Sequence, residues 1–148
     1  MKLNICKVIL LLILFCNVGS ISAEVRWHCE NDSQKITAIL ETLSSDDPIG
    51  KRVGDAALAL VGIPAAESAD NDTLGTIIVR IDSLSRREFI NMAMALAIAS
   101  RKNNPSMRDF EKALQDVSRK KGEDQGFPSQ LFYASDWIVD NVYRGTVK

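Results

Sequence analysis

The chain has 148 residues, a length that suits one domain, and its 46% hydrophobic content is enough to build a core. Its 18 basic and 19 acidic side chains nearly cancel, which gives a formal net charge of −1 at pH 7. No basic stripe stands out along the sequence, and this argues against a nucleic-acid partner.

The N-terminus has the pattern of a secretory signal, which we assign to residues 1–23. Lys2 and Lys7 lie before an apolar run at 8–15, and small residues follow at 20, 22 and 23. The run is shorter than the roughly 20 residues of a membrane-spanning helix. We therefore expect export to the periplasm or cell surface, cleavage near Ala23 and no membrane attachment afterwards. Lipid attachment at Cys16 is the alternative.

The mature chain would contain one cysteine, Cys29, and one histidine, His28. A single cysteine forms no internal disulfide, and one Cys with one His does not fill a zinc site. Neighbouring side chains in an extended chain point to opposite faces, so we expect an exposed pair without a joint role. The sequence also lacks a phosphate-binding glycine pattern, and we predict no metal and no cofactor.

The first half of the mature chain predicts two helices. One follows Ser33 and has an apolar stripe at 36, 39, 40 and 43. The other starts with Asp47 as N-cap and Pro48 as first helical residue, and it stops at Gly62. Its predicted inner face consists of Val53, Ala56, Ala57, Leu60 and Val61.

One strand and a central helix are predicted next. Residues 74–82 are rich in β-branched side chains, which favours a short strand. Ser85 and Glu88 have the spacing of a capping box, so a helix should begin at Arg86. From Phe89 to Ala99 that helix is apolar almost all round, which is typical of a helix covered on most sides.

Two further helices complete the prediction. One follows Pro105 and carries a stripe of Met107, Phe110, Leu114 and Val117. After a loop with glycines, the segment 129–145 predicts a last helix, with Leu131, Trp137 and Ile138 facing inward. The expected fold class is therefore α+β, mostly helical, with one short strand.

Three stretches of the sequence resemble the motifs of one bacterial family. "ALVGIPA" (59–65) is similar to F-L-G-x-P-Y, and "IIVRIDSLSRREFINMAMALA" (77–97) to V-V-N-L-x-x-L-D-C-x-T-F-V-E-x-x-L-A-L-A. "FPSQLFYASDWIVDN" (127–141) is similar to Y-x-S-R-L-H-Y-x-S-D-W-I-x-D-N. This last match is the most specific and covers Ser129, Leu131, Tyr133, Ser135, Asp136, Trp137, Ile138, Asp140 and Asn141.

The family that carries these motifs is related to N-acetylmuramoyl-L-alanine amidases and consists of exported, papain-like cysteine hydrolases of peptidoglycan. The resemblance runs from about residue 49 to the end. It implies three parts: a signal peptide (1–23), an N-terminal segment with a helix (24–48) and a truncated amidase-like domain (49–148). The third part would correspond to the N-terminal helical half of the family fold, without the later β-sheet.

The reactive positions of the family motif are changed in this sequence. The nucleophilic cysteine falls on Arg86, the Asp before it on Ser85, and the family's Thr and Glu on Glu88 and Asn91. The histidine that would activate the cysteine lies on later strands of the family, beyond Lys148. A papain-like site needs a thiolate and an imidazole, and a guanidinium, which stays protonated, is no nucleophile.

The resemblance with these departures predicts a non-catalytic relative of an exported amidase. It would bind peptidoglycan fragments or a periplasmic protein partner, and we expect no catalytic residue. Candidate substrate-binding residues are Tyr133, Asp136, Trp137 and Asn141. Asp136 and Asp140, four residues apart, could form an acid–base pair, but a solvated helix face or a capping role is the plainer interpretation.

Two alternatives remain open at this stage. The chain could be a fragment of a once active cysteine amidase, with no function of its own. It could also be an active cell-wall hydrolase that uses Ser83 or Ser85 in place of the cysteine.

Overall fold

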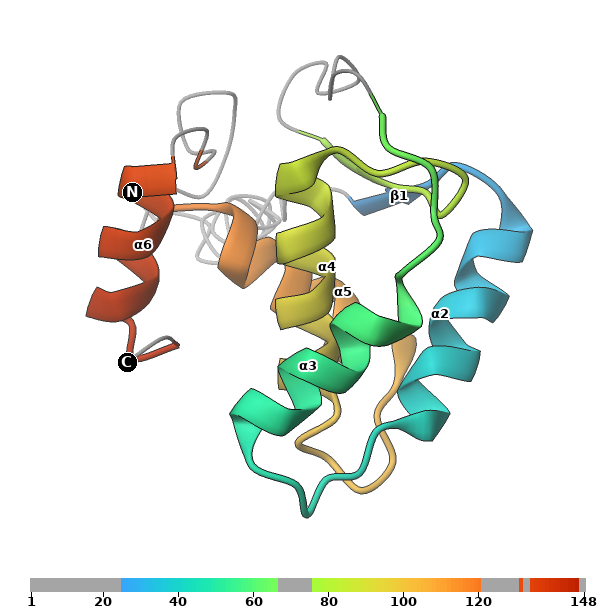
Figure 1. Ribbon diagram of the computed structural model, residues 1–148, viewed down its shortest axis with the longest axis horizontal. Helices are drawn as coiled ribbons and strands as arrows, with labels where there is room; N and C mark the ends of the chain where they lie inside the picture. Colours follow the sequence, from blue (N-terminus) through green and yellow to red (C-terminus); the bar gives the residue numbers. More distant parts are fainter. Residues whose placement is uncertain (1–24, 67–75, 121–130, 132–133, 147–148) are drawn as a thin grey trace, which may run out of the picture.

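The structure is a computed structural model that describes residues 25–66, 76–120, 131 and 134–146. Within these residues, five helices and two short strands follow one another along the chain (Figure 1). Their order is β1 (Val25–Trp27), α2 (Glu30–Thr42), α3 (Ile49–Ala59), β2 (Ile77–Val79), α4 (Arg86–Ala99), α5 (Met107–Ser118) and α6 (Ala134–Tyr143). The predicted α+β, mostly helical class is confirmed.

Helix α4 is the central element, as its apolar sequence predicts. Its residues 91–97 are all buried, and α3 and α5 pack against it. Helices α2 and α6 lie on opposite sides of the α4–α5 pair (Figure 1). The most deeply buried large side chains are Phe110 on α5, Ile36 on α2, Leu60 after α3 and Leu96 on α4. One core therefore draws on four helices that are far apart in sequence.

The two strands form a parallel pair that the sequence predicted only in part. Val25 pairs with Ile77 and Trp27 with Val79, and helices α2 and α3 form the crossover between them. The prediction of a single strand missed β1. A three-residue strand has too little periodicity to be recognised, and its pairing partner lies about 50 residues further along the chain.

A second parallel contact joins the end of the α3 turn to the start of α4. The Leu84 N–H donates to the Pro64 carbonyl, and the Ala66 N–H donates to the Leu84 carbonyl, both at 2.9 Å. Gly62 precedes this contact and has a φ angle of +96°, a backbone conformation that residues with a Cβ atom rarely adopt. Helix α3 itself ends at Ala59, three residues before the predicted stop at Gly62, and Gly62 lies in the turn that follows.

Three local predictions are wrong. Helix α2 begins at Glu30, upstream of Ser33, because the Asp32 carboxylate accepts the Cys29 N–H at 3.3 Å and caps an earlier turn. Val61 is 69% exposed because α3 ends before it. Ile138 is 53% exposed because Trp137, one position round the helix, faces the core instead.

Some predictions fall outside the described residues. The signal sequence assigned to 1–23 and the candidate binding residue Tyr133 are among them. In the part of the chain that is described, none of the helices combines the length and apolar character needed to cross a membrane.

Candidate functional site

The three motif stretches meet around the N-terminal half of α4. Residues 64 and 66, from the first stretch, hydrogen-bond to Leu84 in the second. The indole N–H of Trp137, from the third, donates to Oδ1 of Asn91 at 2.9 Å. These contacts link positions up to 46 residues apart, so the three motif stretches come together at the start of α4.

The first turn of α4 is capped as its sequence predicts. Ser85 Oγ accepts the Glu88 N–H at 3.3 Å, and Glu88 Oε2 accepts the Ser85 N–H at 2.7 Å. This reciprocal pair satisfies two backbone donors that would otherwise lack partners. Arg86 is the first helical residue and is exposed. A helix N-terminus stabilises a thiolate, but the side chain in this place is a cation that cannot attack a carbonyl.

A pocket of about 50 Å³ lies beside this turn, between β2, α4 and α5. Its lining combines apolar and polar side chains. The polar ones are Arg80, Arg87, Glu88, Asn91 and Ser118, and the apolar ones are Ile77, Ile78, Val79, Leu84, Met92 and Leu114. This volume has room for a small polar group or a few water molecules.

The charge in the pocket comes from two arginines and one carboxylate. Arg80 Nη2 lies 3.8 Å from Glu88 Oε1, and both side chains are mostly buried, with 14% and 22% of their surface exposed. The Nε of Arg80 is buried and has no hydrogen-bond partner among the described residues. Arg87 also lines the pocket. Guanidinium groups recognise carboxylates through paired hydrogen bonds, so a lining that contains Arg80 and Arg87 suits an anionic group.

The structure separates the predicted binding residues from one another. Asn141 is fully buried, and its Nδ2 donates to the carbonyls of Trp137 and Val117 at 2.9 and 3.4 Å. Trp137 is half-buried and packs against the core. Asp136 is exposed, with Ser135 Oγ at 3.4 Å. Trp137 and Asn141 therefore join α6 to the rest of the molecule, and Asp136 faces solvent.

The two acidic side chains of α6 have different surroundings. Asp140 is half-buried and forms an ion pair with Arg144, four residues later. Asp136 is on the exposed part of the helix. An acid–base pair needs two carboxyl groups that face a common reacting atom, and this arrangement does not provide it.

The serines of the alternative hydrolase have no histidine beside them. In the part of the chain that is described, Ser85 is engaged in the capping box, and Ser83 Oγ contacts Asp82 Oδ1 at 3.4 Å. A serine nucleophile needs a base within hydrogen-bond reach of its hydroxyl. Among the described residues, no hydrogen bond joins either hydroxyl to the imidazole of His28, and the group beside Ser83 is the carboxylate of Asp82.

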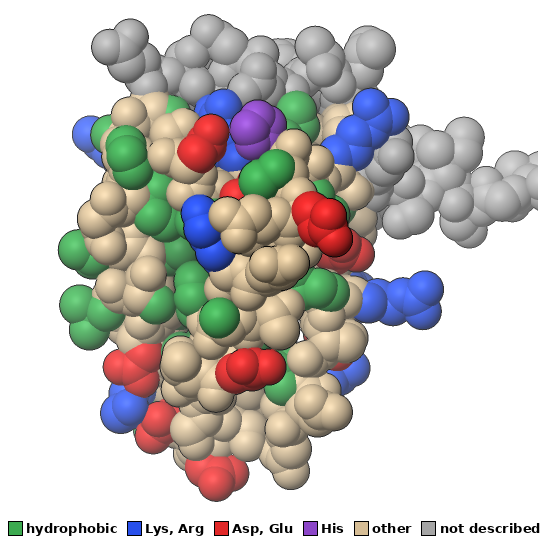
Figure 2. Space-filling model, turned by 90° about the vertical axis from the view of Figure 1, so that its right-hand side faces the viewer, with side chains coloured by type: hydrophobic (Ala, Val, Ile, Leu, Met, Phe, Trp, Pro, Cys, Tyr) green, Lys and Arg blue, Asp and Glu red, His purple; other side chains and the backbone are tan. Residues whose placement is uncertain are grey.

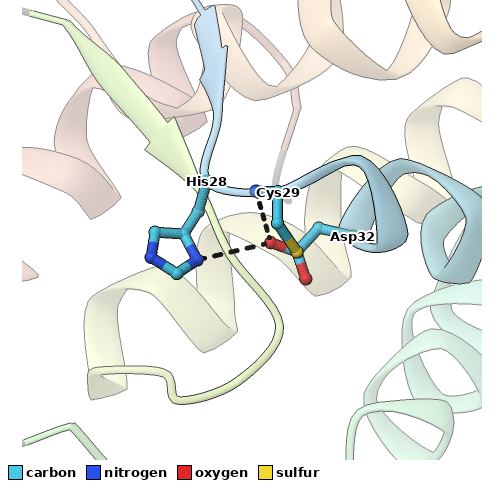
Figure 3. A group of neighbouring side chains, drawn as sticks. All are labelled: His28, Cys29 and Asp32. Atoms are coloured by element: carbon cyan, nitrogen blue, oxygen red, sulfur yellow. Dashed lines mark hydrogen bonds and ion pairs between the residues drawn. The ribbon is translucent and has the colours of Figure 1, made fainter.

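Sequence reasoning missed two groups of side chains. The first consists of Arg80 and Arg87, which line the pocket while the motif position Arg86 does not. The second is a cluster at the start of α2 that contains His28, Cys29 and Asp32 (Figure 3). The expectation that residues 28 and 29 point apart is wrong, because the chain turns into a helix at Cys29. Spacing from 28 to 32, one helical turn, was the available signal.

The comparisons give relatives by structure only. No protein-family model matches the sequence, and no curated protein matches it. A candidate xylanase from Bacteroides fragilis superposes with a TM-score of 0.57 at 26% identity, over 63% of this chain and 41% of that one. Two structures of an N-acetylmuramoyl-L-alanine amidase from Bacteroides uniformis give TM-scores of 0.58 and 0.59 at 21% and 20% identity, over 65% and 66% of this chain.

These matches support the fold that the motifs implied. The chain spans about two fifths of the length of the solved structures, which is 40% and 41% of the two amidase chains. Over that part, the chain has the fold of a cell-wall amidase and of a candidate xylanase, with low sequence identity to both.

Proposed function

We propose that this protein is a non-catalytic relative of exported cell-wall amidases, and that it binds an anionic group of a peptidoglycan fragment in the pocket beside α4. The observation that carries the proposal is the first turn of α4. The chain has an amidase-like fold, and the first turn of α4 has an intact cap at Ser85 and Glu88. In this turn, Arg86 occupies the position of the nucleophile in the family motif.

Several contacts support the loss of catalysis. Ser85 is held by the cap, and Ser83 contacts the carboxylate of Asp82 rather than an imidazole. The single histidine, His28, follows β1, and its Nδ1 lies 3.8 Å from Asp32 Oδ2 and 4.0 Å from Asp82 Oδ2. Acyl transfer needs a nucleophile and a base in contact, and the described residues offer no such pair at α4.

Binding is supported by the charge of the pocket. Peptide stems of peptidoglycan end in carboxylates, and an arginine fork recognises a carboxylate through two parallel hydrogen bonds. Arg80 and Arg87 both line one small pocket, in which Arg80 Nη2 lies 3.8 Å from Glu88 Oε1. The apolar wall at 77–79 lowers the local polarity and strengthens such an ion pair.

The proposal includes export, because the predicted signal at 1–23 would deliver the chain to the periplasm, where peptidoglycan fragments occur. A periplasmic protein is the other predicted partner. Such a protein would bind in the same pocket through an acidic side chain on its surface, and the same test would then use it in place of the soluble fragment.

The test is calorimetry of the purified chain with soluble muropeptides, followed by chromatography of the mixture for cleavage products. We expect binding without cleavage. Replacing Arg87 with Gln, or Arg80 with Gln, should weaken binding by about tenfold or more, the size of one charge-assisted contact. Arg108→Gln, on the exposed surface of α5, is the matched control and should bind as the unchanged chain does.

The possible results separate the hypotheses. Cleavage that disappears in Ser83→Ala or Ser85→Ala would establish a serine hydrolase and overturn the proposal. Binding that is equal in Arg87→Gln, Arg80→Gln and Arg108→Gln would place the ligand elsewhere. Thermal unfolding of each variant, followed by circular dichroism, checks that the compared chains are folded.

A further inference from the structure

A second cluster of reactive side chains lies at the start of α2, separate from the residues that line the pocket. His28, Cys29 and Asp32 each offer one ligand atom, and these three atoms lie within 4.8 Å of one another (Figure 3). His28 Nδ1 is 3.8 Å from Asp32 Oδ2. Ligand atoms around a tetrahedral zinc ion are about 3.4 Å apart, given zinc–ligand distances of about 2.1 Å. The observed spacing therefore needs only a modest contraction.

Asp32 is the fixed part of this cluster. It is 2% exposed, and its Oδ2 accepts the backbone N–H of Cys29 at 3.3 Å. A buried carboxylate is costly unless it has partners, and a cation is the strongest partner it can have. Because this hydrogen bond comes from the backbone of Cys29, Asp32 also holds Cys29 in place.

A fourth candidate ligand, outside this cluster of three, comes from a different part of the chain. Asp82, in the loop between β2 and α4, has its Oδ2 4.0 Å from His28 Nδ1. The loop is brought there by the β1–β2 pairing, which the hydrogen bond from the His28 N–H to the Val79 carbonyl extends at 2.9 Å. The side chains of His28 and Asp82 are 54% and 58% exposed, so an ion can reach them from solvent. Figure 2 shows the histidine, in purple, at the surface.

The donor set favours zinc. It combines one thiol, one imidazole and two carboxylates, which are the ligand types of four-coordinate Zn²⁺, whereas Ca²⁺ and Mg²⁺ prefer oxygen donors alone. With the thiol deprotonated and the imidazole neutral, the four side chains carry three negative charges, which a divalent cation would largely neutralise. On binding, the Zn–S bond forms as the thiol proton passes to solvent.

We infer that His28, Cys29, Asp32 and Asp82 form a zinc site, in contrast to the sequence-based prediction of no metal. The ion would connect the β1–α2 junction to the loop before α4. It would therefore tie the N-terminal segment to the central helix of the fold. This inference does not depend on the proposed function, since none of the four residues lines the pocket.

The test uses the purified chain with Cys6 and Cys16 replaced by Ser, so that Cys29 is its single thiol. Titration with Zn²⁺ in a calorimeter should give one site per chain with a micromolar or tighter dissociation constant. Titration with Co²⁺, a spectroscopic substitute, should add the near-ultraviolet absorption of a thiolate–cobalt bond.

Variants assign the ligands. Cys29→Ser should remove that absorption and weaken zinc binding by about 100-fold or more. It should keep the fold, because Ser is a favourable N-cap. Asp82→Asn should weaken binding by about tenfold, whereas Asp46→Asn, an exposed control in the loop after α2, should leave it unchanged. Zinc should also raise the midpoint of thermal unfolding, since it binds the folded chain.

Two results would overturn the inference. One is the lack of saturable zinc binding by a chain that unfolds cooperatively. The other is binding that Cys29→Ser and Asp82→Asn leave intact, because the ion would then sit at other residues.

Discussion

At the scale of single residues, the contact between Trp137 and Asn91 decides how α6 joins the molecule. The indole N–H donates to Asn91 Oδ1 at 2.9 Å, and Asn91 is only 7% exposed. Its amide would lose a partner inside the protein if the indole were removed. The family-like motif at 135–141 therefore has a structural use in this chain, whatever it binds.

We expect Trp137→Phe to lower the free energy of unfolding by about 1–3 kcal/mol, because a buried acceptor is left unpaired. Urea unfolding measures the loss. In a chain that already carries Asn91→Leu, the same substitution should lower the free energy of unfolding by clearly less. Equal costs in the two backgrounds would mean that the hydrogen bond contributes nothing.

Asp109 gives a residue-scale prediction about pH. The largest effect on its carboxyl is a hydrogen bond from Lys102, and hydrogen bonds from Ser106 add to it. Together they lower the pKa of the carboxyl well below the ordinary value. Since the folded chain prefers the ionised form, the stabilisation is complete above the unfolded pKa of about 3.9 and is lost as the pH falls towards the folded pKa.

The measurement is thermal unfolding of the unchanged chain and of Asp109→Asn across a pH series. The unchanged chain should be the more stable at about pH 6, and the difference should shrink steadily below about pH 4. A difference that is constant over this range would contradict the ionic role of Asp109.

At the scale of elements, the start of α4 is predicted to the residue, whereas the start of α2 is not. Ser85 and Glu88 predict the first residue of α4, and Ser106 with Asp109 forms the equivalent box at α5. A capping box is recognisable because its contacts are only three residues apart. The strand β1 is the opposite case, since nothing within Val25–Trp27 indicates its partner at 77–79.

Removing either cap should destabilise the fold. We expect Ser85→Ala and Ser106→Ala each to cost about 1 kcal/mol, as losing an N-cap serine typically does. Ser83→Ala, two residues before the α4 cap, is the control and should stay within about 0.5 kcal/mol of the unchanged chain. Chemical unfolding of the three variants checks this, and equal effects at 83 and 85 would count against the capping box.

At the scale of the whole molecule, α6 presents apolar side chains to solvent in the described structure. Ile138, Val139, Val142 and Tyr143 are 53%, 69%, 49% and 77% exposed. Their spacing places them along one side of the helix. An uncovered stripe of this kind is typical of a surface that associates with another apolar surface.

We expect the purified chain to self-associate as its concentration rises. Replacing Val139 and Val142 with Lys should keep it monomeric, with little change in thermal stability, because both side chains are already exposed. Sedimentation at several concentrations measures the association. Leu58→Lys, at an exposed apolar position of α3, is the control and should leave the association unchanged. A monomer at all concentrations would contradict this expectation.

The sequence alone determined the features that depend on near neighbours. These are the helical class, the apolar central helix and the cap at Ser85. Periodicity, capping and side-chain chemistry act within a few residues, so they can be read along the chain.

Tertiary structure alone decided which distant side chains meet. The β1–β2 pairing brings Asp82 to His28, and packing around α4 places Arg80 and Arg87 in one pocket while Trp137 turns inward to Asn91. Such contacts depend on the sum of many packing interactions across the core, and no local pattern encodes them. Both proposed sites therefore became visible only in the folded chain.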